Sequence, residues 1–499
     1  MDGLLIGLQA VLQWEHLFFM VMGTFVGLWI GVIPGIGPVM AMAILAPLTF
    51  SMDPLSGLLM LASIHAAGTY GGSVTAIMLN VPGDAASAAT TFDGYPMARQ
   101  GKVRIALGLS TCASFLGGLA GVVTLILAAQ PLIDVALKFG PAEHFALAIL
   151  GLSVVAAVTE GSTLKGLAMG ALGLCLSFVG IDSVLGVARY TFGIVELEAK
   201  LDLVPVLIGL FAVAELMTLM TRGGTIAESG RLEGSLIDGM LMVFRYPASL
   251  LRGIVTGIFV GVVPGIGAVT ANFLSYSLEK MSAREPERFG HGAPEGVIGP
   301  EASNNACVSA ALIPTLTLGI PGSSGAAIVL VALTIHGIRP GGILFTSSPE
   351  LIYGFFVGLL IGAVLFAIMG VLCMPWFALV TLIPVPVLAP ALLVISIFGA
   401  YAYQQSAVDV VVAIAFGLLG FVARRYGYSI LGLVMGLILG ELAETSFHQA
   451  LQISDGSYAI FVARPISGTI LGVSFLAVAW PLFAQARRRA GRKDEAGRP

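Results

Sequence analysis

Long apolar stretches, separated by short loops that hold most of the charged residues, recur along the whole chain. A stretch of about 20 apolar residues can cross a bilayer as a helix, whereas one of 10–14 residues is too short to cross alone. We therefore expect an all-α polytopic membrane protein with about ten to twelve transmembrane spans, and with broken or re-entrant helices where the stretches are short, notably within 37–92 and 267–335. The stretches are residues 17–33, 37–50, 55–68, 105–129, 143–158, 164–181, 203–221, 251–263, 267–278, 302–318, 322–335, 350–373, 377–398, 407–422, 428–444 and 459–484.

Composition excludes a soluble protein. Of 499 residues, 57% are hydrophobic and 10% are charged, and the mean hydropathy is +0.97. Soluble domains carry roughly 25% charged residues, because their surfaces need polar cover. We expect the chain to lie in a lipid bilayer and to have no nucleic acid partner.

Two pairs of similar segments divide the chain into related halves. Residues 23–37 and 253–267 each place three glycines at a four-residue period before a Pro-Gly-Ile-Gly element, so that Gly23 corresponds to Gly253. Residues 79–84 resemble residues 318–323, so that Pro82 corresponds to Pro321; the offset between these two copies is slightly larger than that between the first pair. We expect an N-terminal segment (1–14), a first membrane repeat (15–221), a cytoplasmic linker (222–244), a second membrane repeat (245–444), an external loop with a final helix (445–484) and a basic cytoplasmic tail (485–499).

The distribution of basic residues favours halves of opposite orientation. Cytoplasmic loops are enriched in Lys and Arg. The loop near 93–104 holds three basic residues, but its counterpart near 336–349 holds only His336 and Arg339. The loop near 51–54 holds none, but its counterpart near 280–288 holds three. The basic loop thus changes place between the halves, as an inverted repeat requires. The alternative is that these loop charges are only solvated and do not report the orientation of the halves.

The Pro-Gly elements predict broken helices. Proline cannot donate a backbone hydrogen bond, and glycine tolerates the conformations needed to restart a helix. Irregular backbone inside a membrane is tolerated only within protein or beside a cavity, where free carbonyls attract cations and free N–H groups attract anions. A kinked but uninterrupted helix is the alternative, and the glycine rows predict close helix contacts. The predicted breaks are Pro34, Gly35, Gly37, Pro82, Gly83, Pro264, Gly265, Gly267, Pro321 and Gly322.

Polar residues around the breaks are the candidate binding site. Small neutral residues follow Pro321-Gly322 and leave helix N–H groups open to a carboxylate, whereas Asp84 follows Pro82-Gly83 and suits an N-cap or a cation. We predict substrate binding by Ser87, Asn304, Asn305, Ser323, Ser324 and Gly325, and cation binding by Asn80, Asp84, Thr315 and Gly319. Glu301 is either an ionisable group at membrane depth or the start of an interfacial helix. His65 either lines the cavity or is a core histidine.

No cluster of catalytic residues, phosphate-binding loop or metal-ligand set is evident, so we expect no enzyme and no bound cofactor or metal. A polytopic membrane enzyme would need a catalytic cluster in one loop, and the loop at 279–300 offers none that is convincing. A scaffold would have no reason to bury amides beside broken helices. A transporter remains, either with separate subunits or as a single-component ion-coupled symporter of organic anions.

The residues around these elements resemble the large membrane subunit of the tripartite tricarboxylate transporters. The resemblance covers nearly the whole chain and lies in the twin Pro-Gly-Ile-Gly elements and in residues 80–84, 92–101, 301–306 and 312–322. It implies a bacterial inner-membrane permease that takes up citrate-like di- and tricarboxylates with Na⁺ as the coupling ion. It also implies two partners, a small membrane subunit of about four helices and a periplasmic solute-binding protein.

Overall fold

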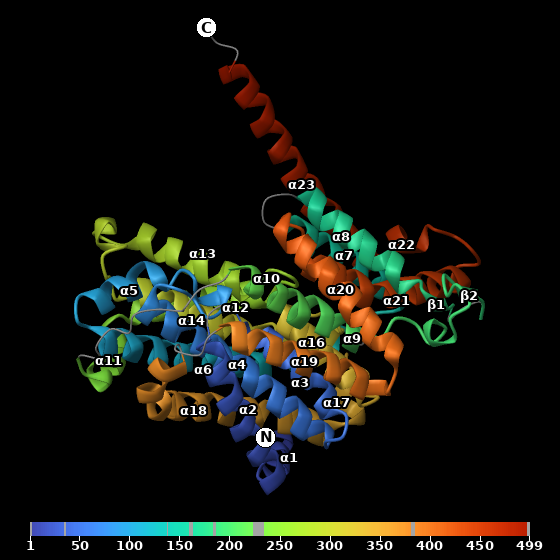
Figure 1. Cartoon of the computed structure of the whole chain (residues 1–499). Helices are drawn as coiled ribbons and strands as arrows, with labels where there is room; N and C mark the ends of the chain where they lie inside the picture. The colour runs from blue at the N-terminus through green and yellow to red at the C-terminus, as the bar shows by residue number, and fades with distance from the viewer. Residues whose placement is uncertain are drawn as a thin grey trace. The chain divides into compact units, whose positions relative to one another are not determined.

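The computed structural model of the chain describes residues 2–33, 36–136, 138–158, 163–182, 186–222, 234–380 and 385–496. It is 81% helical, and helices account for nearly every labelled element (Figure 1). Within the described residues, strand structure is limited to β1 (Gly180–Ile181) and β2 (Ala188–Arg189), an antiparallel pair with Gly180 opposite Arg189. The predicted all-α fold is confirmed.

The chain forms two compact units. Unit 1 comprises Met1–Ala136 and Val204–Phe421, and unit 2 comprises Leu137–Leu203 and Val422–Pro499. These units differ from the two predicted halves, because each half contributes residues to both units. The halves describe which segments are related, and the units describe which segments pack together.

Unit 1 contains all four Pro-Gly elements. Its elements are α1 (Asp2–Val11), α2 (Trp14–Gly31), α3 (Gly37–Thr49), α4 (Pro54–Leu79), η1 (Ala85–Ser87), α5 (Thr91–Arg99), α6 (Val103–Ala136), α9 (Leu203–Leu207), the π-helix η3 (Ile208–Val213), α10 (Ala214–Arg222), α11 (Leu236–Met242), η4 (Val243–Arg245), α12 (Pro247–Val262), α13 (Gly267–Ser282), η5 (Pro286–Arg288), α14 (Glu295–Ala310), α15 (Leu312–Leu318), α16 (Ser324–Ile335), α17 (Leu344–Ser347), α18 (Pro349–Val380), α19 (Val385–Gln404) and most of α20 (Ala407–Arg425).

Unit 2 is a smaller helical bundle. It holds α7 (Pro141–Val158), α8 (Thr163–Ser177), β1, β2, η2 (Val195–Leu197), α21 (Ile430–Ile453), α22 (Ile460–Ala463) and α23 (Pro465–Ala496). Helix α21 packs against α7 and α8. Arg189 holds Glu444 of α21 through two hydrogen bonds of 2.7 and 3.0 Å, and Arg464 pairs with the buried Glu143 at 2.7 Å.

Six helices of the described chain are long and apolar enough to cross a membrane, or seven if the bent pair Leu236–Arg245 and Pro247–Val262 counts as one span. The polytopic membrane fold is therefore confirmed. Several further apolar helices are shorter, for example α3, α8 and α16 with 13, 15 and 12 residues. At 1.5 Å per residue these shorter helices do not reach across a hydrocarbon core of about 30 Å. The predicted ten to twelve spans included several of them.

The glycine rows build close helix contacts. An added Cβ at Gly257 would lie 2.2 Å from the backbone oxygen of Ser303, which no real side chain tolerates. Gly253 and Gly261 also lie close to α14, at 2.4 and 2.7 Å, and the row on α2 meets α4 in the same way through Gly23, Gly27 and Gly31. Absence of a side chain is what lets α2 approach α4, and α12 approach α14. The predicted close contacts are confirmed.

Backbone conformation also repeats between the halves. Asn80 and Gly319, which correspond when Pro82 is aligned with Pro321, both end a helix in the left-handed conformation, with φ of 59° and 71°. Gly37 and Gly267, which end the two Pro-Gly-Ile-Gly elements, have φ of 66° and 76°. The two halves therefore share their turns as well as their sequence. Their opposite orientation in the membrane stays a prediction.

Candidate functional site

All four Pro-Gly elements lie between helices. They separate α2 from α3, α4 from η1, α12 from α13, and α15 from α16. Pro34 and Gly35 lie outside the described residues. In the second half the two elements touch, because the N–H of Gly265 donates to the carbonyl of Gly322 at 3.0 Å. In the first half Gly83 packs against the carbonyl of Gly31, and the Asp84 carboxylate lies beside Gly37. Each half thus brings its own two breaks together.

The breaks also pack across the halves, and they do so reciprocally. In the register that aligns Pro82 with Pro321, His65 corresponds to Asn304, and Ala86 corresponds to Gly325. The His65 ring lies against Gly325, where an added Cβ would be 2.2 Å from it. The Asn304 amide donates to the carbonyl of Ala86 at 3.2 Å. Contacts exchanged in this way are what a two-fold relation between similar bodies produces. The segment that follows each second Pro-Gly element, η1 or the start of α16, therefore packs on a helix of the other half.

Glu301 lies at the centre of this arrangement. It is in the second turn of α14 and is fully buried. Four hydroxyl groups of the first half donate to its carboxylate, those of Ser73 at 2.6 Å, Ser114 at 2.9 Å, Ser110 at 3.2 Å and Thr90. The helix begins well before this residue, at Glu295, so the interpretation of Glu301 as a helix start is wrong.

The Glu301 carboxylate has no counterpart in the first half. In the same register its position is taken by Ala62. The repeated fold therefore does not itself require an acid here. A buried carboxylate is costly unless donors surround it, and these four hydroxyls satisfy both oxygens. An asymmetric, fully satisfied carboxylate between two similar halves is a strong candidate for function.

Three of the predicted substrate residues lie near this carboxylate. The Ser87 hydroxyl is hydrogen-bonded to the Ser73 hydroxyl at 3.0 Å, and Ser73 in turn donates to Glu301. Asn304 and Asn305 are buried on α14 and bond to each other at 2.8 Å. Asn272 of α13 accepts from the N–H of Ala89 at 2.8 Å. The segment after the first break is thus fixed by amides of the second half.

The other three predicted substrate residues form the start of α16. The Ser323 hydroxyl caps this helix by accepting from the N–H of Ala326 at 3.2 Å. Among the described residues, no acceptor pairs with the N–H groups of Ser324 and Gly325. A cavity of about 20 Å³, enough for one water, is lined by His65 and Asn305. His65 is buried and lines this small, mostly apolar cavity, and its ring also contacts Gly325 of the second group.

The predicted cation residues divide between the two breaks. Asn80 and Gly319 supply the left-handed turns. Thr315 donates to the carbonyl of Ala311 at 2.6 Å and accepts from the N–H of Gly322 at 3.3 Å, so it holds the second break in place. The Asp84 carboxylate faces the N–H groups of Ala85 and Ala86, without the geometry of a side-chain N-cap. The described residues contain no group of three His, Cys, Asp or Glu side chains that could hold a metal ion.

Asp93 has a role that the sequence did not reveal. Its carboxylate is buried and accepts from the N–H groups of Gly290, Gly292 and Ala293 at 2.8–2.9 Å, and from the Tyr276 hydroxyl at 3.0 Å. The three N–H groups belong to the loop that leads into α14. Asp93 therefore anchors the loop of one half to α5 of the other.

Comparison with known proteins agrees with this architecture. The model of the tripartite tricarboxylate transporter TctA family matches residues 17–435. An uncharacterised 52.8 kDa protein in the TAR-I ttuC' 3' region of Agrobacterium vitis is 38% identical over 496 residues, 98% of this chain and 97% of that protein. An uncharacterised protein in the TAR-II ttuC' 3' region of the same organism is 38% identical over 234 residues, 47% of this chain and 96% of that protein. No solved structure matches.

The family match includes every Pro-Gly element, the Glu301 cluster and the Asp93 anchor, and it extends over most of the chain. The full-length relative covers the remaining ends as well. The chain belongs to the tripartite tricarboxylate transporter TctA family.

Proposed function

We propose that this protein is the large permease subunit of a binding-protein-dependent secondary transporter, and that it imports di- or tricarboxylates on a sodium gradient. It lies in the bacterial inner membrane with a cytoplasmic C-terminus. A small membrane subunit of about four helices and a periplasmic solute-binding protein complete the system. It is a carrier rather than an enzyme. The family supports the transport role, and the Glu301 cluster between the two halves supports the place where transport occurs.

The substrate carboxylate binds at the start of α16. The N–H groups of Ser324 and Gly325 are unpaired among the described residues, and a helix N-terminus with free N–H groups favours an anion. The Ser324 hydroxyl is a further donor at this end, and Asn305 and His65 line the same small cavity. Asp84 keeps the corresponding end of the first half negative, so the carboxylate binds at the second break only.

Sodium binds at the Glu301 cluster. A hard cation takes oxygen ligands, and this cluster offers two carboxylate oxygens with four hydroxyl oxygens around them. A hydroxyl group that now donates to Glu301 also carries lone pairs that can turn to a cation. The oxygens near Asn80, Asp84, Thr315 and Gly319 are the second candidate. They divide between the two breaks, whereas the Glu301 oxygens already converge.

Uptake by proteoliposomes tests the proposal. The protein is reconstituted with its small subunit and supplied with binding protein and labelled carboxylates, with and without an inward sodium gradient. We expect gradient-driven uptake that Ser324→Leu and Asn304→Leu abolish while both variants stay folded. Thr469→Leu, which replaces an exposed hydroxyl on α23, is the matched control. Normal uptake by both site variants would refute the placement of the substrate.

A single-component symporter of organic anions is the alternative function. It predicts the same sodium dependence but no need for other subunits. Uptake by the permease alone, unchanged when the binding protein is left out, would favour this alternative.

A further inference from the structure

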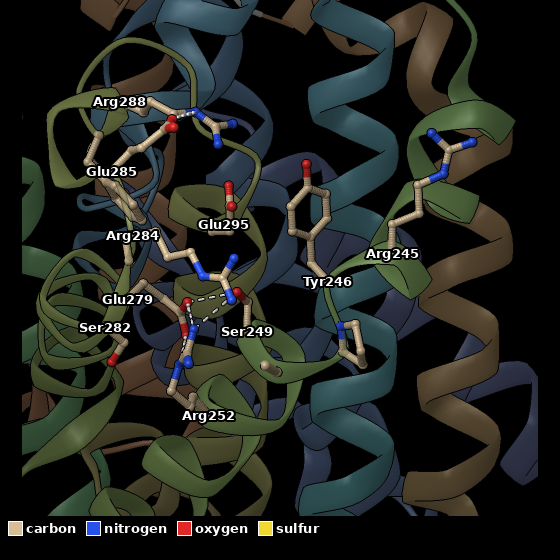
Figure 2. A pocket seen from close by; sticks show the side chains of 14 residues that line it. Arg245, Tyr246, Ser249, Arg252, Glu279, Ser282, Arg284, Glu285, Arg288 and Glu295 are labelled. Carbon is tan, nitrogen blue, oxygen red and sulfur yellow. Dashed lines mark hydrogen bonds and ion pairs between the residues drawn. The ribbon is translucent and has the colours of Figure 1, made fainter.

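A pocket of about 670 Å³ lies away from the Pro-Gly elements, where η4, the start of α12, the loop after α13 and the start of α14 meet. This volume lies within the range of small-ligand sites. Figure 2 shows arginine side chains from several of these segments around the pocket. The arginines are Arg245, Arg252, Arg284 and Arg288.

Two of the four arginines are already paired. Arg252 binds Glu279 through two hydrogen bonds of 2.6 and 2.9 Å, and Arg288 lies 3.9 Å from Glu285. Across the described part of the chain, Arg245 and Arg284 have no acidic partner at ion-pair distance. A pocket that retains two unpaired guanidinium groups can bind an anion, and phosphate is the anion that their planar donors fit best.

The same pocket also has an unpaired acceptor. The Oε2 atom of Glu295 is buried and has no hydrogen-bond partner, and its side chain is among those around the pocket in Figure 2. A buried carboxylate oxygen without a donor is costly. A ligand that satisfies the whole pocket therefore carries an anionic group for the arginines and, next to it, an N–H or O–H donor for Glu295.

Apolar surfaces beside the pocket indicate its depth in the membrane. Helix α11 with η4 meets α12 at 84°, and it exposes Ile237, Leu241 and Phe244, which lie on one helical face. Helix α12 exposes Leu251, Val255 and Phe259 at four-residue spacing. A short helix with one exposed apolar face, bent steeply away from its neighbour, is suited to the bilayer surface. The arginines at this corner are then level with lipid headgroups.

A second pocket, lined by first-half residues that include Glu15 and by second-half residues between 336 and 351, lacks these positive charges. It is lined by Glu15, Asp53 and Glu350, and no Lys or Arg is among its lining residues. In the register that aligns Gly23 with Gly253, Glu15 corresponds to Arg245. This one pair of related positions therefore carries opposite charge, and the four arginines are not repeated in the second pocket.

We propose that this pocket binds the headgroup of a phospholipid, with phosphatidylethanolamine as the best fit. Arg245 and Arg284 bind its phosphate, and the Glu295 carboxylate accepts from its ammonium group. The acyl chains lie along the exposed apolar face of α12. The site holds a structural lipid at the bend between α11 and α12, separate from the substrate and sodium sites.

Native mass spectrometry of the delipidated full chain tests this proposal. We measure binding of phosphatidylethanolamine, of phosphatidylcholine with the same acyl chains, and of soluble glycerophosphoethanolamine. Phosphatidylethanolamine should bind best, because the trimethylammonium of phosphatidylcholine has no N–H donor. Arg245→Gln with Arg284→Gln should weaken both lipids about tenfold or more. Glu295→Leu, which has no acceptor, should remove the preference for phosphatidylethanolamine. Arg339→Gln, at an exposed loop position, should change neither.

Three results would overturn the proposal. The double arginine variant would bind phosphatidylethanolamine as the wild type does, or Glu295→Leu would keep the lipid preference. Alternatively, glycerophosphoethanolamine would bind as tightly as the intact lipid, which would make this a site for a soluble phosphate compound. Gel filtration and melting of each variant show whether it is still folded, so that loss of lipid binding is not mistaken for unfolding.

Discussion

Gly257→Ala should separate α12 from α14. The new Cβ would start 2.2 Å from the backbone oxygen of Ser303, whereas ordinary contact begins near 3.4 Å. The helices must therefore move apart by about 1 Å, since the obstructing atom belongs to the backbone and cannot rotate away. Overpacking of this kind costs about 1–3 kcal/mol. Because α14 carries Glu301 and Asn304, the shift should also lower uptake.

The apparent melting temperature of the purified protein measures this effect. We expect Gly257→Ala to melt a few degrees below the wild type, and Gly27→Ala, where the clash is 2.6 Å with Ile64, to behave alike. Gly362→Ala is the matched control, because its nearest neighbour would be 3.6 Å away. There the higher helix propensity of alanine should leave stability equal or slightly higher. If Gly257→Ala melted with the control, the close-contact explanation of the glycine rows would be wrong.

Three further variants test other parts of the structure by melting. Asp93→Ala leaves three N–H groups without their acceptor and should lower the free energy of unfolding by more than about 3 kcal/mol. Asp93→Asn, which keeps an acceptor, should lower it much less. Equal losses of stability in the two variants would argue against the anchoring role of Asp93. Gly319→Val places a β-branched residue at φ 71° and should cost about 1–2 kcal/mol, while Asn80→Gly should be tolerated. Arg464→Leu leaves the buried Glu143 without its ion pair and should lower the melting temperature clearly more than Lys138→Leu.

The sequence was sufficient for the features that depend on local chemistry. A low charged fraction and long apolar stretches predict a membrane protein, because hydrocarbon excludes charge from most of the chain. The Pro-Gly elements indicate where helices end, since proline and glycine act on their own backbone. The glycine rows predict close helix contacts for the same reason. Each of these signals lies within a few neighbouring residues.

Features that depend on distant partners could not be read in this way. The hydroxyls around Glu301 come from residues 187–228 positions away. Serine and threonine are common in membrane helices and have no spacing that identifies an acid's partners. Glu301 was therefore recognised as ionisable, but its place at the centre of the site was not. Asp93 presents the same difficulty, because its partners are N–H groups of a loop about 200 residues away. The reciprocal contacts of His65 and Asn304 follow from the repeat only when the packing is known.

Sodium-dependent melting tests the central claim most directly. A ligand that binds only the folded protein at 100 times its dissociation constant stabilises it by about 2.7 kcal/mol. We predict that NaCl raises the melting temperature of the wild type above its value in equimolar choline chloride. Glu301→Gln should remove this difference, and Asp134→Asn, an exposed acid on α6, should keep it. If Glu301→Gln retained the full sodium-dependent shift, the carboxylate between the two halves would not be the sodium site.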